Sequence, residues 1–205
     1  MNFKYIRQLA DRRSIILGSG SPRRYALLKE TGISFNQKTP STEENIKPGE
    51  HPYQYARRLA EEKAVAVSRL VRPDEIVIGA DTVVLIDKEI LGKPADEDEA
   101  FQTLMYLSGK KHEVCTALAL AEKGQVLASA YEITEVYFNF LSPEKIKEYI
   151  STGEPMDKAG AYGIQGIGAF LVDRIKGNLD NVIGFPCNLL ERLAGETIDK
   201  LQLFD

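Results

Sequence analysis

Two serines and two arginines stand together in the segment Ser19–Arg24 (SGSPRR), where a short apolar run ends. Ser21 followed by Pro22 is typical of a helix start, with serine as the N-cap and proline at the first helical position. Arg23 and Arg24 then fall in the first turn, where the helix dipole disfavours a cation by roughly 0.3–1 kcal/mol unless an anion is bound. Backbone N–H groups at a helix start attract phosphate. The segment therefore indicates a phosphate site, and two solvated arginines are the alternative.

Two charged residues interrupt apolar patterns further along the chain. Lys63 lies on the apolar stripe of a predicted helix over Pro52–Val71, one turn after Leu59. Its ammonium either reaches water past the stripe or points inward at a negative charge. Asp81 stands inside the β-rich run Glu75–Ile86, where burying an isolated carboxylate is costly. It is either hydrogen-bonded to backbone at a strand bend, or it serves as a general base or a metal ligand.

Residues 153–168 hold five glycines, which let the backbone approach a ligand closely. Within them Gln165 offers both a donor and an acceptor, which suits the edge of a nucleobase. Ordinary turns are the alternative for this glycine-rich segment. Lys93, Glu43 and Glu44 also stand in predicted loops, where each alone fits a solvated charge. Taken together, several cations, a few carboxylates and a glycine-rich loop fit a polyphosphate held with a divalent metal.

The elements that position these residues follow from apolar periodicity and turn residues. We expect strands over 14–18, 75–86, 112–121, 126–140 and 170–174, and a short return strand after the turn at Asp87 and Lys88. We expect helices over 22–31, 52–71, 96–108, 143–150 and 186–193, and loops over 35–51 and 91–95. Helices interleaved with strands predict an α/β fold, with one mixed twisted sheet and flanking helices.

Composition limits the classes of protein that fit. A chain of 205 residues is expected to form a single domain over 1–205. With 27% charged residues and a net charge of −4, it has no bulk attraction for nucleic acid or anionic membranes. No apolar stretch is long enough for a membrane span, and the polar segment Met1–Arg13 has no signal-peptide pattern, so we expect a cytoplasmic protein. Cys115 and Cys187 read as buried, reduced thiols.

Six motifs carry a resemblance to a known family, in that family's order. They are SGSPRR at 19–24, RLAEEKA at 58–64, GADTVV at 79–84, GKP at 92–94, LSGKKH at 107–112 and DKAGAYGIQG at 157–166. On these motifs the chain, over residues 14–193, resembles the Maf family of nucleoside triphosphate pyrophosphatases. The resemblance implies an α/β fold of two lobes around a central cleft, like that of the inosine triphosphate pyrophosphatases. It also implies a house-cleaning hydrolase acting on acid anhydrides, a Mg²⁺ or Mn²⁺ cofactor and a homodimer.

The resemblance also implies roles for single residues. Asp81 matches the proton acceptor that activates water, and Glu44 matches a carboxylate that holds the metal, to which Asp81 is a second candidate ligand. The residues that match phosphate contacts are Ser19, Ser21, Arg24, Lys63 and Lys93. Those that match positions setting base preference are Arg23, Thr82 and Gln165.

Arg23, together with Tyr162 and Gln165 in the glycine-rich segment, is similar to the subfamily that hydrolyses dTTP and UTP. The sister subfamily, which acts on 7-methyl-GTP, is patterned differently at these places. We therefore expect hydrolysis of dTTP, UTP and modified pyrimidine nucleotides to the monophosphate and pyrophosphate. The alternative is a nucleotide-binding regulator of septum formation and cell division that acts through a protein partner. The carboxylates at Asp81 and Glu44 favour the enzyme, since a binding module needs no base.

Overall fold

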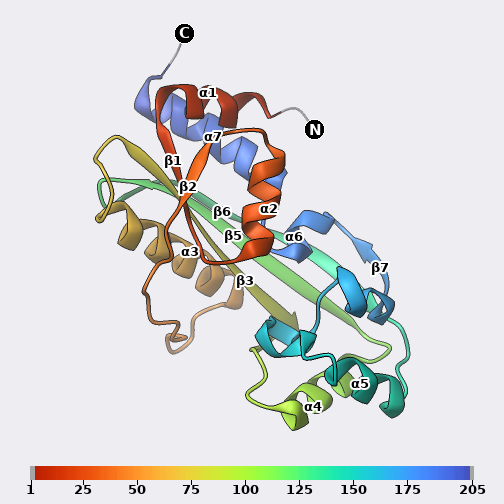
Figure 1. Cartoon of the computed structure of the whole chain (residues 1–205). Coiled ribbons are helices and arrows are strands. Elements are labelled where there is room, and N and C mark those ends of the chain that lie inside the picture. The colour runs from red at the N-terminus through yellow and green to blue at the C-terminus, as the bar shows by residue number, and fades with distance from the viewer. Residues whose placement is uncertain (1–2, 204–205) are drawn as a thin grey trace. The chain divides into compact units, whose positions relative to one another are not determined.

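A computed structural model describes residues 3–203 of the chain (Figure 1). Its α-helices are α1 (Lys4–Arg12), α2 (Pro22–Glu30), α3 (Pro52–Ser68), α4 (Glu97–Leu107), α5 (Pro143–Ile150), α6 (Leu179–Ile183) and α7 (Cys187–Leu201). Its strands are β1 (Ser14–Gly18), β2 (Phe35–Gln37), β3 (Glu75–Ile86), β4 (Glu89–Leu91), β5 (Lys111–Glu122), β6 (Gln125–Phe138) and β7 (Val172–Lys176). Short 3₁₀ helices cover Glu154–Asp157 (η1), Ala159–Ala161 (η2) and Gly166–Leu171 (η3).

The strands form one mixed sheet in the order β2-β1-β3-β5-β6-β7, with β4 paired to β3. β1 runs parallel to both β2 and β3, whereas β4 is antiparallel to β3 and β7 is antiparallel to β6. The apolar runs of β1 and β3 fit this arrangement, because parallel strands are buried on both faces. The predicted α/β class, with a mixed sheet and flanking helices, is confirmed.

The chain divides into two compact units. Unit 1 runs to Asp81 and adds Thr116–Glu132 and the chain from Gly184 onward. Unit 2 comprises Thr82–Cys115 and Ile133–Ile183. That these units are lobes around a cleft, and that 1–205 is a single domain, stay predictions.

In unit 1, the close approach of α3 to β3 depends on Gly79. A Cβ at Gly79 would lie 2.3 Å from the Ala60 carbonyl oxygen and 2.7 Å from the Ala64 backbone nitrogen, so a side chain there would force helix and strand apart. Residues two apart in a strand share a face. Asp81 therefore shares the helix-facing side of β3 with Gly79, and Lys63 precedes Ala64 on the facing helix. The glycine thus brings the carboxylate and the ammonium together.

Helices α1 and α7 lie side by side in the same unit (Figure 1). The Glu191 carboxylate of α7 accepts hydrogen bonds from the backbone N–H groups of Tyr5 and Ile6, at 2.6 and 3.0 Å, and so caps the start of α1. The prediction gave α7 as a helix over 186–193 and missed α1. Both differences have one physical reason, since each helix buries its apolar face against the other.

Other predicted bounds need correction. The predicted loop over 35–51 contains β2, which is held by its parallel pairing with β1. The strand predicted over 170–174 begins later, as β7, because η3 occupies the residues before it. β4 extends to Leu91, at the start of a predicted loop, and α6 was not predicted. The predicted N-cap role of Ser21 is confirmed, since its hydroxyl accepts from the backbone N–H of Arg24. Ser142 caps α5 in the same way.

The core of unit 2 packs α4 and α5 around the strands, and Figure 1 shows these two helices side by side. Leu104, Leu107 and Tyr149 are among its fully buried members, and Ala161 and Tyr162 of the glycine-rich segment join them. This packing anchors the middle of that segment. Among residues 3–203, no helix has the length and apolar character that crossing a bilayer requires. The predicted burial of both cysteines is confirmed.

Candidate active site

The centre of the candidate site in unit 1 is the ammonium of Lys63, which lies between two carboxylates. Its Nζ donates to Asp81 Oδ1 at 2.5 Å and lies 2.6 Å from Glu44 Oε1. Lys63 is 8% exposed and Asp81 is 6% exposed. The alternative in which Lys63 reaches into water is therefore wrong, and its inward orientation toward a negative charge is confirmed. Asp81 binds a cation within an apolar strand, so its charge has a partner inside the fold.

Arg24 extends from the first turn of α2 toward the middle of β3. Its Nη1 donates to the Ala80 carbonyl at 2.9 Å and to Ser19 Oγ at 3.2 Å, and its Nε donates to the Gly184 carbonyl at 3.0 Å. Ser21 completes the turn by accepting from the Arg24 backbone N–H at 3.4 Å. The interpretation of Arg24 as a solvated side chain is wrong. The structure brings a fixed guanidinium and two serines together beside the carboxylate strand.

The charges of this cluster act on one another. Burial raises the pKa of Asp81, although the neighbouring Lys63 and Arg24 act to lower it. Burial lowers the pKa of Arg24, and the Asp81 carboxylate opposes that change. Arginine nevertheless stays protonated in proteins. The cluster is thus a desolvated carboxylate beside two cations, which is an arrangement typical of sites that bind an anion or transfer a proton.

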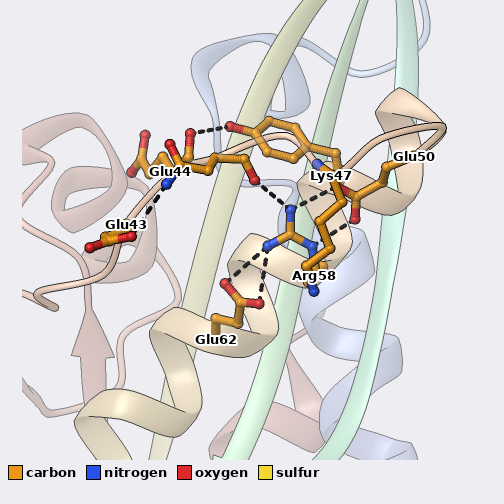
Figure 2. A network of polar contacts seen from close by, with 8 residues as sticks. Glu43, Glu44, Lys47, Glu50, Arg58 and Glu62 are labelled. Atoms are coloured by element: carbon orange, nitrogen blue, oxygen red, sulfur yellow. Dashed lines mark hydrogen bonds and ion pairs between the residues drawn. The ribbon is translucent and has the colours of Figure 1, made fainter.

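Three residues without a predicted role also support the cluster. Gln37 Nε2 donates to the Ser19 carbonyl at 2.6 Å, and the Tyr55 hydroxyl donates to the Glu44 carbonyl at 3.0 Å. Arg58 binds the loop that carries Glu44 (Figure 2). Arg58 stands in the RLAEEKA motif, so the sequence contained a signal for it. Gln37 and Tyr55 gave no such signal.

The donor set fits a divalent cation of the hard kind. Glu44 and Asp81 direct carboxylate oxygens at one ammonium, and Glu44 is 54% exposed at its side chain. Mg²⁺ is usually bound through one or two carboxylates, with substrate phosphates and water completing its shell. Within residues 3–203, no group of three or more His, Cys, Asp or Glu side chains forms a metal cage. Two carboxylates therefore suit a metal that arrives with a phosphate ligand.

Three of the predicted site residues belong to unit 2. Thr82 follows Asp81 on β3, while Lys93 and Gln165 are exposed in loops. The backbone N–H of Gly160 donates to the Gly92 carbonyl at 2.9 Å, which joins the loop of Lys93 to the glycine-rich segment. That these residues complete the site stays a prediction. Arg23, the remaining predicted residue, is half-buried beside Arg24 in unit 1.

Comparisons with known proteins agree with these motifs. The family model described as Maf-like protein matches residues 14–197. A protein of Syntrophomonas wolfei named dTTP/UTP pyrophosphatase is 48% identical over 171 residues, which cover 83% of this chain and 90% of that protein. Proteins of the same name from Aquifex aeolicus and Salmonella typhimurium are each 47% identical, covering 89% and 84% of this chain and 94% and 87% of their own length.

Among solved structures, a nucleoside-triphosphatase / dITP/XTP pyrophosphatase of Mycobacterium abscessus has a TM-score of 0.42 and 13% identity, covering 93% of this chain and 97% of its own. This similarity is too low to assign a function to the chain. The family model, in contrast, spans the residues of the serine–arginine turn, the Lys63 helix, the Asp81 strand and the glycine-rich segment. On that match, and on relatives that share nearly half of the aligned residues, this chain belongs to the Maf-like protein family.

Proposed function

We propose that this chain is a nucleoside triphosphate pyrophosphatase that hydrolyses dTTP and UTP to the monophosphate and pyrophosphate. One observation carries the proposal most directly. A buried carboxylate, Asp81, stands within 2.5 Å of the Lys63 ammonium and on the strand that accepts the Arg24 guanidinium. The names of the curated relatives, dTTP/UTP pyrophosphatase, supply the reaction and the substrates that this arrangement fits.

The cations of unit 1 bind the triphosphate. Arg24 is already oriented by three oxygen acceptors, so it meets phosphate oxygens with little loss of side-chain freedom. The ammonium of Lys63 exchanges part of its contact with carboxylates for contact with phosphate. Ser19 and Ser21 lie at the start of α2, where their hydroxyls accept from the backbone N–H groups of Ser21 and Arg24 and keep their own protons to donate to phosphate oxygens. Lys93 of unit 2 adds a further cation.

Asp81 is the general base. Its carboxylate accepts a proton from water as the water oxygen forms a bond to the α-phosphorus. The bond from that phosphorus to the bridging oxygen breaks on the opposite side, and pyrophosphate leaves with the electron pair. A base of this kind contributes roughly 10²–10⁴-fold to a rate. Lys63 and Arg24 favour the ionised form of Asp81 and lie where negative charge accumulates on the phosphates.

Glu44 and Asp81 are the residues that would hold Mg²⁺ or Mn²⁺. When bound, such an ion neutralises phosphate charge and polarises the bond to phosphorus. Glu44 suits this task, because its side chain is half-exposed and extends from a loop toward the Lys63 ammonium.

We assign the preference for a particular nucleobase to Arg23, Thr82 and Gln165. The Gln165 amide can donate to one atom of a pyrimidine edge and accept from another. A base that leaves such a group unpaired on burial is penalised by about 1–3 kcal/mol, which is enough to separate pyrimidines from purines.

The test is a panel of the common triphosphates and 7-methyl-GTP with Mg²⁺, in which pyrophosphate and monophosphate are measured separately. We expect dTTP and UTP to be the best substrates. Preference for GTP or 7-methyl-GTP would refute the proposed preference for thymine and uracil nucleotides. Release of a nucleoside diphosphate and inorganic phosphate would refute the pyrophosphatase reaction.

Hydrolysis in water enriched in ¹⁸O locates the attack. We expect the label in the monophosphate, since water bonds to the α-phosphorus. Label in the pyrophosphate would show attack at the β-phosphorus and would overturn the proposed attack of water on the α-phosphorus.

A further inference from the structure

Arg58 of α3 binds the loop that carries Glu44. We define the Glu44 loop as residues 43–50, which follow the short strand β2 and precede α3. The guanidinium donates from Nε to Glu50 Oε1 at 2.6 Å and from Nη2 to Glu50 Oε2 at 2.7 Å (Figure 2). The same Nη2 donates to the Asn45 carbonyl at 2.9 Å. The hydrogen bonds from Arg58 to Glu50 lower the pKa of Glu50 to about 2, so its carboxylate is ionised at neutral pH.

The remaining nitrogen of the guanidinium binds α3 itself. Nη1 donates to both carboxylate oxygens of Glu62, at 3.0 and 3.1 Å. All three guanidinium nitrogens are therefore engaged, and the Arg58 side chain is 18% exposed. A planar fork held at each nitrogen has one orientation, which the compact ammonium of a lysine does not reproduce. Arg58 is thus a rigid link from α3 to the loop.

The loop residue that matters for the reaction lies next to this link. Glu44 directly precedes Asn45, and its own carbonyl accepts from the Tyr55 hydroxyl at 3.0 Å. Two consecutive peptide carbonyls of the loop therefore bind to side chains of α3. The Glu44 carboxylate then reaches Lys63, on the same helix, at 2.6 Å. An ion pair of an exposed carboxylate is worth little by itself, so the position of this carboxylate depends on how its backbone is held.

We infer that Arg58 is a positioning residue, whose guanidinium fixes the Glu44 loop on α3 and thereby holds the Glu44 carboxylate beside Lys63 for the reaction. The inference rests on the proposed function, because it assigns Arg58 a part in that reaction through Glu44. Arg58 touches no reacting atom in this account. Arg58 affects the rate only because it determines the position of the Glu44 carboxylate.

The neighbouring arginine is a matched control. Arg57 lies on the same helix, but its Nε donates to Glu61 at 3.1 Å and to Ser129 Oγ at 2.9 Å, away from the loop. Its side chain is 42% exposed. Replacing Arg57 with Gln removes the same charge from α3 and leaves the link to the Glu44 loop in place.

The experiment is a double-mutant cycle of Arg58→Gln and Glu44→Gln, with kcat and KM for dTTP measured on the folded, full-length chain. We expect Arg58→Gln to lower kcat roughly 10- to 100-fold, by about the factor that Glu44→Gln does. The double variant should lose no more than either single variant, since both remove one positioned carboxylate. Arg58→Lys should rescue little of the loss, and Arg57→Gln should keep the wild-type kcat.

Amide hydrogen exchange gives a readout that needs no substrate. The Glu50 N–H donates to the Lys47 carbonyl at 3.0 Å, and the Lys47 N–H donates to Glu50 Oε2 at 3.2 Å. We expect both amides to lose protection in Arg58→Gln while the amides of α3 keep theirs. In Arg57→Gln all of them should stay protected. This measurement also tests the link to the loop separately from the proposed function. A wild-type chain that releases no pyrophosphate would refute the proposed function, but the exchange result would still show whether Arg58 holds the loop.

Three results would overturn the inference. One is a double variant whose loss equals the product of the single losses. Another is an Arg58→Gln chain with lower thermal stability but wild-type kcat, which would make the arginine structural only. The third is a Glu44→Gln chain with full activity. If Arg58→Gln does not fold, Glu50→Gln takes its place, since it weakens the link to the loop and leaves the Arg58–Glu62 pair on α3.

Discussion

The two units bury polar side chains in opposite ways. Unit 1 buries ions, because Lys63 and Asp81 form a pair in which each residue is less than a tenth exposed. Unit 2 buries polar groups that stay neutral. His112 is 1% exposed, its Nε2 lies 2.7 Å from the Tyr162 hydroxyl, and burial lowers its pKa to about 4. Burial also raises the pKa of Tyr162, so neither partner carries charge at neutral pH.

This difference separates a buried ion pair, which fits a reaction, from a buried neutral pair, which fits packing alone. A buried ion pair is weak as a source of stability, because desolvation of both ions offsets their attraction. Its presence in unit 1 is better explained by chemistry that needs a carboxylate and cations at that place. A neutral histidine–tyrosine pair needs no such explanation, since it adds a hydrogen bond within an aromatic cluster with Phe138. The following substitutions test this contrast.

Asp81→Asn should give the largest effect. The amide keeps the size of the carboxylate and accepts from Lys63, but it takes no proton from water. We expect kcat to fall roughly 10²–10⁴-fold with the fold retained. Pyrophosphate release measures the first, and circular dichroism with thermal unfolding checks the second. A folded Asp81→Asn chain with wild-type turnover would show that this buried ion is structural after all.

Lys63→Met should give the next largest effect, in stability as well as in rate. Removing one partner of a buried pair costs about 3–5 kcal/mol of unfolding free energy. Lys63 lowers the pKa of Asp81, so its loss raises that pKa further. The folded state then binds a proton that the unfolded state has released, and the stability deficit grows as pH rises.

Urea unfolding of Lys63→Met at pH 5 and pH 8 measures this slope. Lys29→Met, at an exposed position of α2, is the matched control and should show no such pH dependence. A deficit of equal size at both pH values would mean that Asp81 does not respond to the lysine.

The contrast between the units also shows what a sequence reveals. Lys63 and Asp81 were found because each contradicts an apolar pattern whose period is visible locally. Ser21 was found because a cap acts within three residues. Gly184, whose carbonyl orients Arg24 from 160 positions away, left no local signal. The same holds for Glu191, which caps α1 from the other end of the chain.

Helix bounds failed for a related reason. The predicted last helix stops at Leu193, just before Gly195, a residue of low helix propensity. α7 nevertheless continues to Leu201, since its buried face packs on α1 and tertiary packing overrides propensity. Neither helix is specified by its own residues alone. Prediction therefore recovered the sheet class and two charged residues of the candidate site, and it missed the contacts made between distant segments.

His112→Gln tests the neutral half of the comparison. An unfolded histidine has a pKa of about 6.5, and the buried ring has one of about 4, so the unfolded state binds the proton first as pH falls. Stability from this group is complete above pH 6.5 and is lost toward pH 4. Between pH 7 and 4.5 we expect wild type to lose on the order of 2 kcal/mol more than His112→Gln.

The control is His51→Gln, the same change at the exposed N-cap of α3. It should leave the wild-type slope of unfolding free energy against pH in place, and His112→Gln should keep the wild-type kcat at pH 7. A His112→Gln chain that is well folded and inactive would show that the buried neutral pair also serves the reaction, and would break the contrast between the two buried pairs.

Glu154→Gln should give the smallest effect. It allows the contacts of Glu154 in unit 2 to be compared with those of Arg58 in unit 1. In unit 2 the Glu154 carboxylate accepts from the backbone N–H groups of Ile167 and Gly168, each at 3.2 Å, and from the Tyr149 hydroxyl at 3.0 Å. The Glu154 carboxylate thus binds backbone N–H groups of the glycine-rich segment. Arg58, in contrast, binds oxygen atoms of the Glu44 loop. Gln keeps one acceptor, so we expect a loss of about 1 kcal/mol in stability.

The kinetic consequence of Glu154→Gln should differ in kind. The glycine-rich segment carries Gln165, which we propose binds the nucleobase of the substrate and not the reacting phosphates. A looser segment should therefore raise KM for dTTP a few-fold and leave kcat unchanged, whereas Arg58→Gln should lower kcat. Glu148→Gln, at an exposed position of α5, is the control for charge. A fall in kcat with KM unchanged would mean that the segment serves the chemical step, and the two links would then have one function.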